Sequence, residues 1–263
     1  MTIHVFKGSI SLHGTKPLYD RRNLDRVLEV IEDEGFTPWS AGLDERGGLR
    51  YSRDGALSVL SNPPVALDQT ALILRQKAPR KYLGAVVLWE QAGIWFEFEP
   101  NQPDGTWPRM FALAGGLANA FEPDWGGVGL IIGERDDSPR VLVGDDARDV
   151  DLLGRATDLA RIDYVSHGPE GLGMRTYIGP FFAEQLGRER IETLPLLVEK
   201  LSWGGYRVDL VPEPWTLELP LILDAWRLGM AHLRDAGIFA VPAAKPTFAS
   251  RLDPGPNAKL RGD

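Results

Sequence analysis

The chain contains no cysteine among its 263 residues, and it has only four histidines and four methionines. The lack of cysteine excludes disulfide bonds, thiolate metal ligands and a cysteine nucleophile, and it fits a reducing compartment. Long apolar runs are also missing. The longest, 84–89 and 128–132, are far below the roughly 20 residues that a membrane-spanning helix needs. We therefore expect a protein without a membrane span that is held together by its core.

The N-terminus shows no targeting pattern. Residues 1–7 alternate apolar and polar side chains, whereas a secretory signal peptide needs a continuous apolar stretch. We therefore expect a cytoplasmic protein.

The chain has fewer basic than acidic residues. The chain has 29 Lys and Arg residues against 37 Asp and Glu, which gives a formal net charge of −8. Binding to DNA or RNA needs basic side chains that displace counterions from phosphates, so we expect no nucleic-acid partner. A basic protein partner suits this charge better. The acidic side chains concentrate in two segments, and the candidate partner-binding residues among them are Glu29, Glu32, Asp145 and Asp146.

Sequence motifs for common cofactors are also missing. The chain has no Gly-x4-Gly-Lys-Ser/Thr loop for nucleotide phosphates and no Gly-x-Ser-x-Gly turn of an α/β-hydrolase. The glycines of 127–133 lack the third glycine of a dinucleotide-binding loop. No two histidines have the spacing of a helical zinc site, and the aspartates of 136–151 do not follow the calcium-loop pattern. We therefore expect neither a cofactor nor a metal ion.

Hydrophobic periodicity predicts a mixture of helices and strands. Asn23 is placed to cap a first helix and Gly35 to end it, while Pro108 suits the first turn of a second helix that the residues 124–127 end. Further helices are expected at 150–159, 180–186, 194–201 and 218–234. Strands are expected at 3–12, 49–51, 56–60, 71–75, 83–88, 95–99, 128–132, 141–143, 163–165, 174–178, 206–211 and 238–241. The sequence thus predicts an α+β fold.

When the sequence is compared with itself at a shift of 112 residues, two segments resemble each other, and we call this similarity the internal echo. It places Gly93 on Gly205, Pro100 on Pro212 and Pro108 on Pro220, and each copy continues into an amphipathic helix and an apolar strand. Chance placement of Pro and Gly is the alternative reading. If the echo is a duplication, it predicts two pseudo-repeated halves, each a mainly antiparallel sheet with helices packed on one face. The halves would be 1–135 and 136–241, followed by a flexible or surface-lying tail at 242–263.

One constellation could carry enzymatic chemistry. Asp163, His167, Glu170 and Arg175 bracket a glycine-rich stretch at 168–173. A histidine oriented by a carboxylate can act as a general base, and an arginine can hold an anionic substrate group. An ordinary strand connection with polar residues is the competing interpretation.

The tryptophans offer a second type of site. Trp107, Trp125, Trp203 and Trp215 lie at expected loop edges beside Pro, Gly or acidic residues. Large rings at loop rims supply binding area at low entropy cost, so these four are candidate partner-binding residues. The alternative is that they hold their own loops against the helices. The patterns around Trp95 and Trp226 indicate core positions instead.

The C-terminal segment resembles bacterial immunity proteins of type VI and polymorphic toxin systems. The resemblance rests on the sequence of 175–180, the helix that runs to Gly187, the sequence of 208–210 and Trp226, and it covers about 70 residues. It implies a small cytoplasmic α+β protein that binds and blocks a cognate toxin, with no catalytic residues.

These observations lead to three hypotheses. The leading one is a non-enzymatic protein of immunity type that binds a basic toxin, because acidic surfaces steer association with basic partners. The second is a hydrolase-like enzyme that uses Asp163, His167 and Arg175. The third is a structural or assembly component of a bacterial or phage machine.

Overall fold

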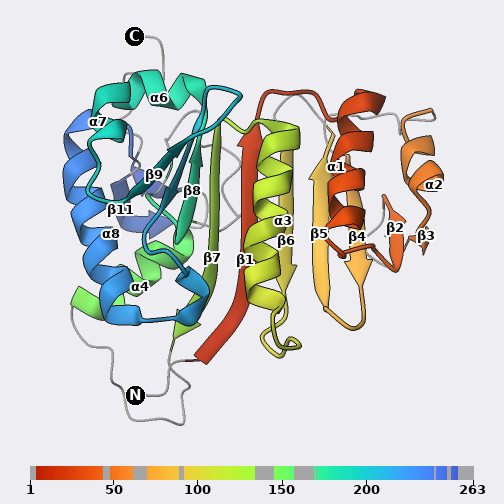
Figure 1. Ribbon diagram of the computed structural model, residues 1–263, viewed down its shortest axis with the longest axis horizontal. Helices are drawn as coiled ribbons and strands as arrows, with labels where there is room; N and C mark the ends of the chain where they lie inside the picture. The colour runs from red at the N-terminus through yellow and green to blue at the C-terminus, as the bar shows by residue number, and fades with distance from the viewer. Residues whose placement is uncertain are drawn as a thin grey trace.

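The computed structural model (Figure 1) describes residues 4–43, 48–61, 70–88, 92–133, 145–156, 169, 171–239, 241–247 and 250–253. Within these residues the chain forms one long antiparallel sheet with helices packed on it, so the predicted α+β fold is confirmed.

Ten strands build the main sheet in the order β3-β2-β4-β5-β6-β1-β7-β8-β10-β9. Every neighbouring pair is antiparallel. The first strand, β1, lies near the middle of the sheet between β6 and β7. It is therefore paired with two strands that come much later in the sequence. The strands are β1 (His4–Gly14), β2 (Ser40–Gly42), β3 (Leu49–Arg50), β4 (Ala71–Gln76), β5 (Tyr82–Val87), β6 (Ala92–Phe98), β7 (Trp125–Gly133), β8 (Arg175–Ile178), β9 (Leu197–Lys200) and β10 (Tyr206–Asp209).

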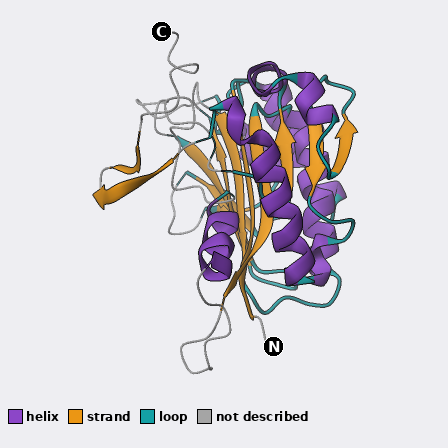
Figure 2. Cartoon of the chain, turned by 90° about the vertical axis from the view of Figure 1, so that its left-hand side faces the viewer, coloured by secondary structure: helices purple, strands orange, loops and turns teal. Residues whose placement is uncertain are grey.

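Two long helices, α1 (Arg21–Asp33) and α3 (Thr106–Phe121), cover one face of the sheet (Figures 1 and 2). The apolar stripe of α1 is fully buried, and burial stabilises the fold by roughly 2 kcal/mol for each such side chain. Ile10 and Leu12 of β1 point to the same core. Successive side chains of a strand alternate between faces, so Lys7, Ser9 and Ser11 point to the opposite face.

The start of the first helix differs from the prediction, whereas Pro108 lies in the first turn of α3 as predicted. Asp20, not Asn23, caps α1, and its carboxylate accepts hydrogen bonds from the backbone N–H groups of Arg22 and Asn23 at 2.8 and 3.3 Å. Asn23 instead donates from its side chain to the carbonyl of Pro17. Gly35 ends the helix with a positive φ of 76°, as predicted.

The C-terminal part adds shorter elements around β8, β10 and β9. The helices beyond α1 and α3 are α2 (Arg53–Ser58), α4 (Asp145–Arg155), α6 (Pro180–Leu186), α7 (Arg188–Glu192) and α8 (Leu219–Leu233), with 3-10 turns η2 (Pro214–Thr216) and η3 (Arg234–Ala236). Gly154 of α4 packs against Ile131 of β7, whose side chain points away from α3. The sheet therefore carries helices on both faces near β7.

Two predicted elements have the wrong type. Residues 194–201 were expected to be helical, but β9 occupies Leu197–Lys200 and pairs with β10. Residues 56–60 were expected to be a strand, but Ser52 caps the short helix α2 there. At β9 the local pattern was overridden by pairing with β10, whereas at α2 the capping serine just before the segment was a local signal that the apolar pattern hid. The predicted strands at 141–143 and 163–165 lie outside the described residues.

The internal duplication stays a prediction. β6 and β10, which the 112-residue shift aligns, both lie in the main sheet. The strands that should follow the aligned helices differ, because β7 joins the main sheet while β11 (Val241–Thr247) pairs only with β12 (Ser250–Asp253). The proposed halves share one sheet rather than forming one sheet each. The predicted tail also contains this β11–β12 hairpin.

Among the helices of the described residues, none combines the length and apolar character that crossing a membrane would require.

Candidate functional site

The four candidate tryptophans lie largely within the molecule. Trp125 was expected at a loop rim, but it begins β7 and is 4 % exposed, with its ring in edge contact with Phe182 and Phe239. Trp203 lies in the turn between β9 and β10 against Gly205, where a Cβ atom would come within 2.1 Å of the indole. Trp125 therefore offers a partner little area, while Trp203 is half-buried.

Trp107 and Trp215 are half-buried around α3. Trp107 lies in the first turn of α3, and Trp215 in η2. The ring of Trp215 is 5.5 Å from that of Phe111 on α3, so it fastens the segment before α8 to the helix layer. The structure thus brings Trp215 to α3 but places Trp125 and Trp203 on other elements.

The candidate acidic residues form two clusters, one around Arg53 and the other around Arg227 and Arg148. In the first, which we call the α1–α2 cluster, Arg53 of α2 lies 2.7, 3.4 and 3.5 Å from carboxylate oxygens of Asp25, Glu29 and Glu32. The hydroxyl of Tyr51 donates a further hydrogen bond to Glu32 at 2.7 Å. Three carboxylates against one guanidinium leave this cluster with a net charge of −2.

The second cluster joins α4 to α8. Arg227 of α8 donates to Asp149 at 2.7 Å and to Asp146 at 2.5 Å, and it lies 3.6 Å from Asp224. Asp149 is buried, whereas Asp146 is half exposed. Asp145 lies beyond this group and approaches Arg148 at 3.7 Å. The predicted Asp145 and Asp146 are therefore exposed on α4, and Asp146 also holds the helix against α8.

Of the four residues in the enzyme hypothesis, the structure describes only Arg175, because Asp163, His167 and Glu170 lie outside the described residues. Arg175 on β8 is 8 % exposed and donates to Asp209 on β10 and to the carbonyl of Phe111. Burial opposes the charged form of Arg175, but the hydrogen bonds and charges of Asp209 and Tyr177 together outweigh this, so the pKa of the guanidinium lies above its usual value. The charge of this arginine is thus already neutralised within the fold.

Tyr177 completes this buried polar group under α3. It is 1 % exposed, and burial raises the pKa of its hydroxyl to about 12, although the nearby Arg175 partly opposes the rise. Arg207, on the neighbouring strand, bridges Asp209 at 3.0 Å and Glu199 at 2.7 Å. These residues connect β8, β10 and β9, and both guanidinium groups are already paired with acceptors of the protein itself.

A serine and a histidine meet on β1. The Ser11 hydroxyl oxygen lies 2.8 Å from Nε2 of His13. Burial lowers the pKa of His13 to about 4, so its ring is neutral at pH 7 and could act as a base. Ser11, however, is 2 % exposed, so a substrate cannot reach it in this conformation. The pair is therefore assigned a structural role.

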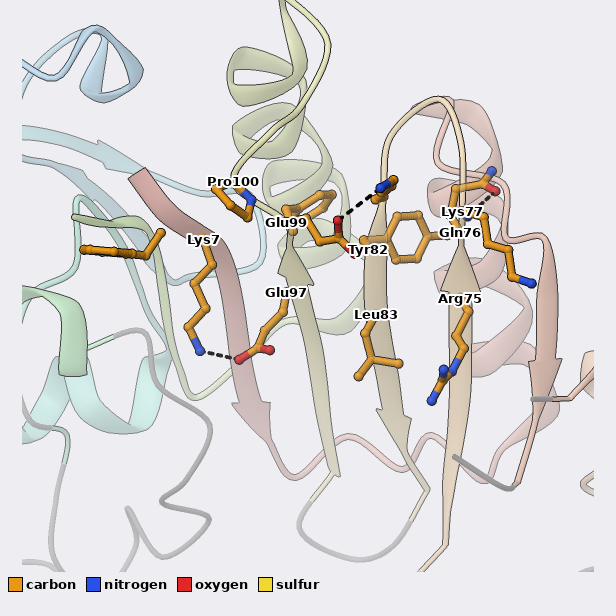
Figure 3. Close-up of a pocket in the computed structure, with 12 residues that line it drawn as sticks. Lys7, Arg75, Gln76, Lys77, Tyr82, Leu83, Glu97, Glu99 and Pro100 are labelled. Atoms are coloured by element: carbon orange, nitrogen blue, oxygen red, sulfur yellow. Dashed lines mark hydrogen bonds and ion pairs between the residues drawn. The ribbon is translucent and has the colours of Figure 1, made fainter. Parts of the chain in front are cut away.

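A cavity of about 580 Å³ lies at one end of strands β1, β6, β5 and β4. Figure 3 shows side chains from these four adjacent strands around it. The cavity is lined by Phe6, Lys7, Arg75, Gln76, Lys77, Lys81, Tyr82, Leu83, Glu97, Phe98, Glu99 and Pro100. Its volume is in the range of small-molecule sites.

The charges around this cavity are organised by strand. Glu97 and Glu99 of the β6 segment lie between Lys7 on one side and Lys81 on the other. Lys7 pairs with Glu97, and Lys81 lies 3.4 Å from Glu99. On the β4 side, the ammonium of Lys77 lies over the exposed ring of Trp39 at 4.1 Å. Four cations against two carboxylates give the lining a net charge of +2.

Sequence reasoning did not find this cavity. Its charged residues come from three segments, 7, 75–81 and 97–99, and only the strand register brings these together. The basic turn after β4 was the available signal, because Lys77, Arg80 and Lys81 crowd three cations into five residues. No group of His, Asp or Glu side chains that could hold a metal ion occurs in the part of the chain that the structure describes.

Comparisons with known proteins reach only the fold. No family model matches the chain. The curated proteins contain no match either. Among solved structures, the chain is similar to the Pseudomonas aeruginosa T6SS protein PA0821, with a TM-score of 0.50 and 11 % sequence identity over 98 % of this chain and 81 % of that one. At this identity the similarity concerns the arrangement of helices and strands alone.

Proposed function

We propose that this protein is a type VI secretion-associated binding protein of immunity type, which binds and neutralises a basic cognate toxin. The observation that carries the proposal is the α1–α2 cluster, in which Asp25, Glu29 and Glu32 share the single cation of Arg53. The similarity of the fold to that of a T6SS protein also supports a role associated with type VI secretion.

The α1–α2 cluster suits a protein interface better than the α4–α8 cluster does. Close to it, Leu49 on β3 is 86 % exposed and Trp39 is 48 % exposed. The backbone N–H of Tyr51 donates to the carbonyl of Trp39, which ties these apolar side chains to the residue that contacts Glu32. Acidic side chains beside exposed apolar ones suit an interface with a basic protein, since opposite charge steers encounter and apolar area supplies affinity.

The first test uses a toxin encoded by the gene next to this one. Cells that produce the neighbouring toxin should survive when they also produce this protein, and the purified pair should form a complex. Asp25→Asn combined with Glu29→Gln should weaken the complex about tenfold at low salt, because both carboxylates belong to the α1–α2 cluster and are about half exposed. The matched control is Glu189→Gln combined with Glu213→Gln, which removes the same charge from exposed positions elsewhere.

Two outcomes would contradict the proposal in whole or in part. If cells are not protected from any toxin encoded beside the gene, the immunity proposal is wrong. If protection occurs but both double variants bind equally, the function stands and the α1–α2 cluster is not the interface.

An assembly component of a secretion machine is the second candidate, favoured by the T6SS name of the structural neighbour. Deletion of the gene would then abolish secretion by the system, whereas deletion of an immunity gene would leave secretion intact and expose the cell to its own toxin. The hydrolase hypothesis is less well supported, because Asp209 and the carbonyl of Phe111 already occupy the guanidinium of Arg175.

A further inference from the structure

We propose that the cavity between β1, β6, β5 and β4 binds an organic anion, a carboxylate or phosphate group carried on an apolar body. The inference does not rest on the proposed function, because the cavity is lined by other residues than the α1–α2 cluster, although Trp39 lies beside both. It begins from a contrast in charge: the whole chain has a net charge of −8, whereas the lining of this cavity has a net charge of +2.

The strand register determines how the charged residues of the lining are arranged. Glu97 faces Ser9 across β1 and Leu83 across β5, and Leu83 in turn faces Arg75 on β4. Both carboxylates therefore lie at the end of β6, Glu97 within the strand and Glu99 just after it, with cations on both sides. Figure 3 shows Lys7, Glu97, Leu83 and Arg75 in a row across the four strands. An anion placed toward β4 would meet Arg75 and Lys77 while keeping away from Glu97 and Glu99.

The cation on the β4 side is held in place before any ligand arrives. The ring of Trp39 lies 4.1 Å from the ammonium of Lys77, and such a contact restrains the long side chain without neutralising its charge. Gln76 fixes the start of the turn, because its side chain donates to the carbonyl of Thr37 at 2.6 Å and accepts from the N–H of Lys77 at 3.0 Å. A restrained lysine loses less entropy when it binds an anion.

The remaining wall of the cavity is apolar. Phe6, which is 46 % exposed, lies at its β1 side, and Leu83 and Pro100 contribute further carbon surface. A bare inorganic ion would use only the cations. A ligand with an apolar body next to its anionic group would also remove this surface from water, and a volume of about 580 Å³ admits a molecule of that size.

The experiment uses the full chain and 8-anilinonaphthalene-1-sulfonate, a fluorescent organic anion, as the probe. We expect saturable binding that weakens with added salt, because charge contributes to it. Phenyl phosphate and 3-phenylpropionate should displace the probe, and 3-phenylpropanol, which has the apolar body without the charge, should not. The relative strength of the first two competitors distinguishes phosphate from carboxylate ligands.

Substitutions in the lining should shift the affinity in opposite directions. Lys77→Gln should weaken probe binding about fivefold, because it removes a cation from the β4 side. Glu99→Gln should tighten binding about threefold, because it raises the net charge of the lining from +2 to +3. Glu99 is 60 % exposed in its side chain, so its loss leaves the fold intact. Lys200→Gln, on the exposed edge strand β9, is the matched control and should leave affinity unchanged.

A purely structural role for these charges predicts a different result. The proposal is overturned if the probe does not saturate, if 3-phenylpropanol competes as well as 3-phenylpropionate, or if Lys77→Gln and Glu99→Gln change the affinity in the same direction. Tightening by Glu99→Gln is the most specific outcome, because the loss of a surface ion pair does not by itself improve binding of an anion.

Discussion

Arg175 on β8 and Asp209 on β10 face each other directly in the strand register and are joined by a 2.5 Å hydrogen bond, with both side chains almost excluded from solvent. Such a pair has already lost its hydration, so each charge depends on the other. Arg175 also donates to the carbonyl of Phe111 and thereby ties the C-terminal strands to α3.

Breaking this ion pair should destabilise the protein strongly. We expect Asp209→Asn to lower the free energy of unfolding by about 3 to 5 kcal/mol, because the guanidinium of Arg175 would remain buried without its counter-charge. Urea unfolding followed by circular dichroism measures the change. Glu199→Gln, at a side chain that is 53 % exposed and pairs with Arg207, should cost under about 1 kcal/mol. Equal losses for the two variants would contradict the assigned role of the buried pair.

Gly179 should not tolerate a side chain. A Cβ atom there would lie 2.4 Å from the carbonyl oxygen of Pro123 and 2.7 Å from Cα of Asp124, and backbone atoms cannot move aside cheaply. Gly179→Ala should therefore lower the unfolding free energy by about 2 kcal/mol or more. Gly115→Ala is the matched control, since its Cβ atom would meet only the Tyr177 hydroxyl at 3.6 Å, and it should be neutral or stabilise α3 by about 0.5 kcal/mol. Thermal melts of both variants distinguish these outcomes.

His13 should make stability depend on pH. Burial lowers its pKa from 6.5 to about 4, so below pH 6.5 the unfolded chain binds a proton that the folded chain refuses. The stability is fully present above pH 6.5 and is lost as the pH falls toward 4, by about 3 kcal/mol at the lower limit. The difference in unfolding free energy between the natural chain and His13→Gln, measured from pH 7 to pH 4, isolates this contribution. A difference that does not vary with pH would show that His13 titrates normally.

Arg227 should hold α4 in place. Arg227→Gln leaves the buried carboxylate of Asp149 with Arg148 as its cation, at 3.3 Å. We expect amide hydrogens of α4 to exchange at least tenfold faster, while those of α1 stay unchanged. Hydrogen exchange read by mass spectrometry tests this, with Arg234→Gln as a control at an exposed position beyond α8. Unchanged exchange in α4 would mean that apolar packing against β7 suffices.

Local patterns in the sequence predicted the long elements well. The apolar stripe of α1, the proline in the first turn of α3 and the alternation of β6 each describe one segment in contact with one core, so periodicity reveals them. The short elements were less predictable. The segment 194–201 has apolar residues at helical spacing, yet the unpaired edge of β10 makes a strand of Leu197–Lys200.

The roles of individual side chains depended on contacts that spacing does not encode. Trp125 follows a glutamate, a proline and an aspartate, which is typical of a loop, but the residues that enclose it, Phe182 and Phe239, lie more than 50 positions away in the sequence. Arg175 was a candidate for anion binding for the same reason that it pairs with Asp209: it is a cation in a polar segment. Only its neighbour across the sheet decides which anion it holds.

The sequence by itself determined the α+β class, the long helices and the acidic balance, because these follow from composition and from periodicity within single segments. The tertiary structure alone decided that the acidic residues gather around Arg53 and Arg227 and that a positively charged cavity forms beside Glu97 and Glu99. Charge clusters and cavities arise from the order and register of strands, and antiparallel pairing brings together residues that lie up to 129 positions apart in the chain.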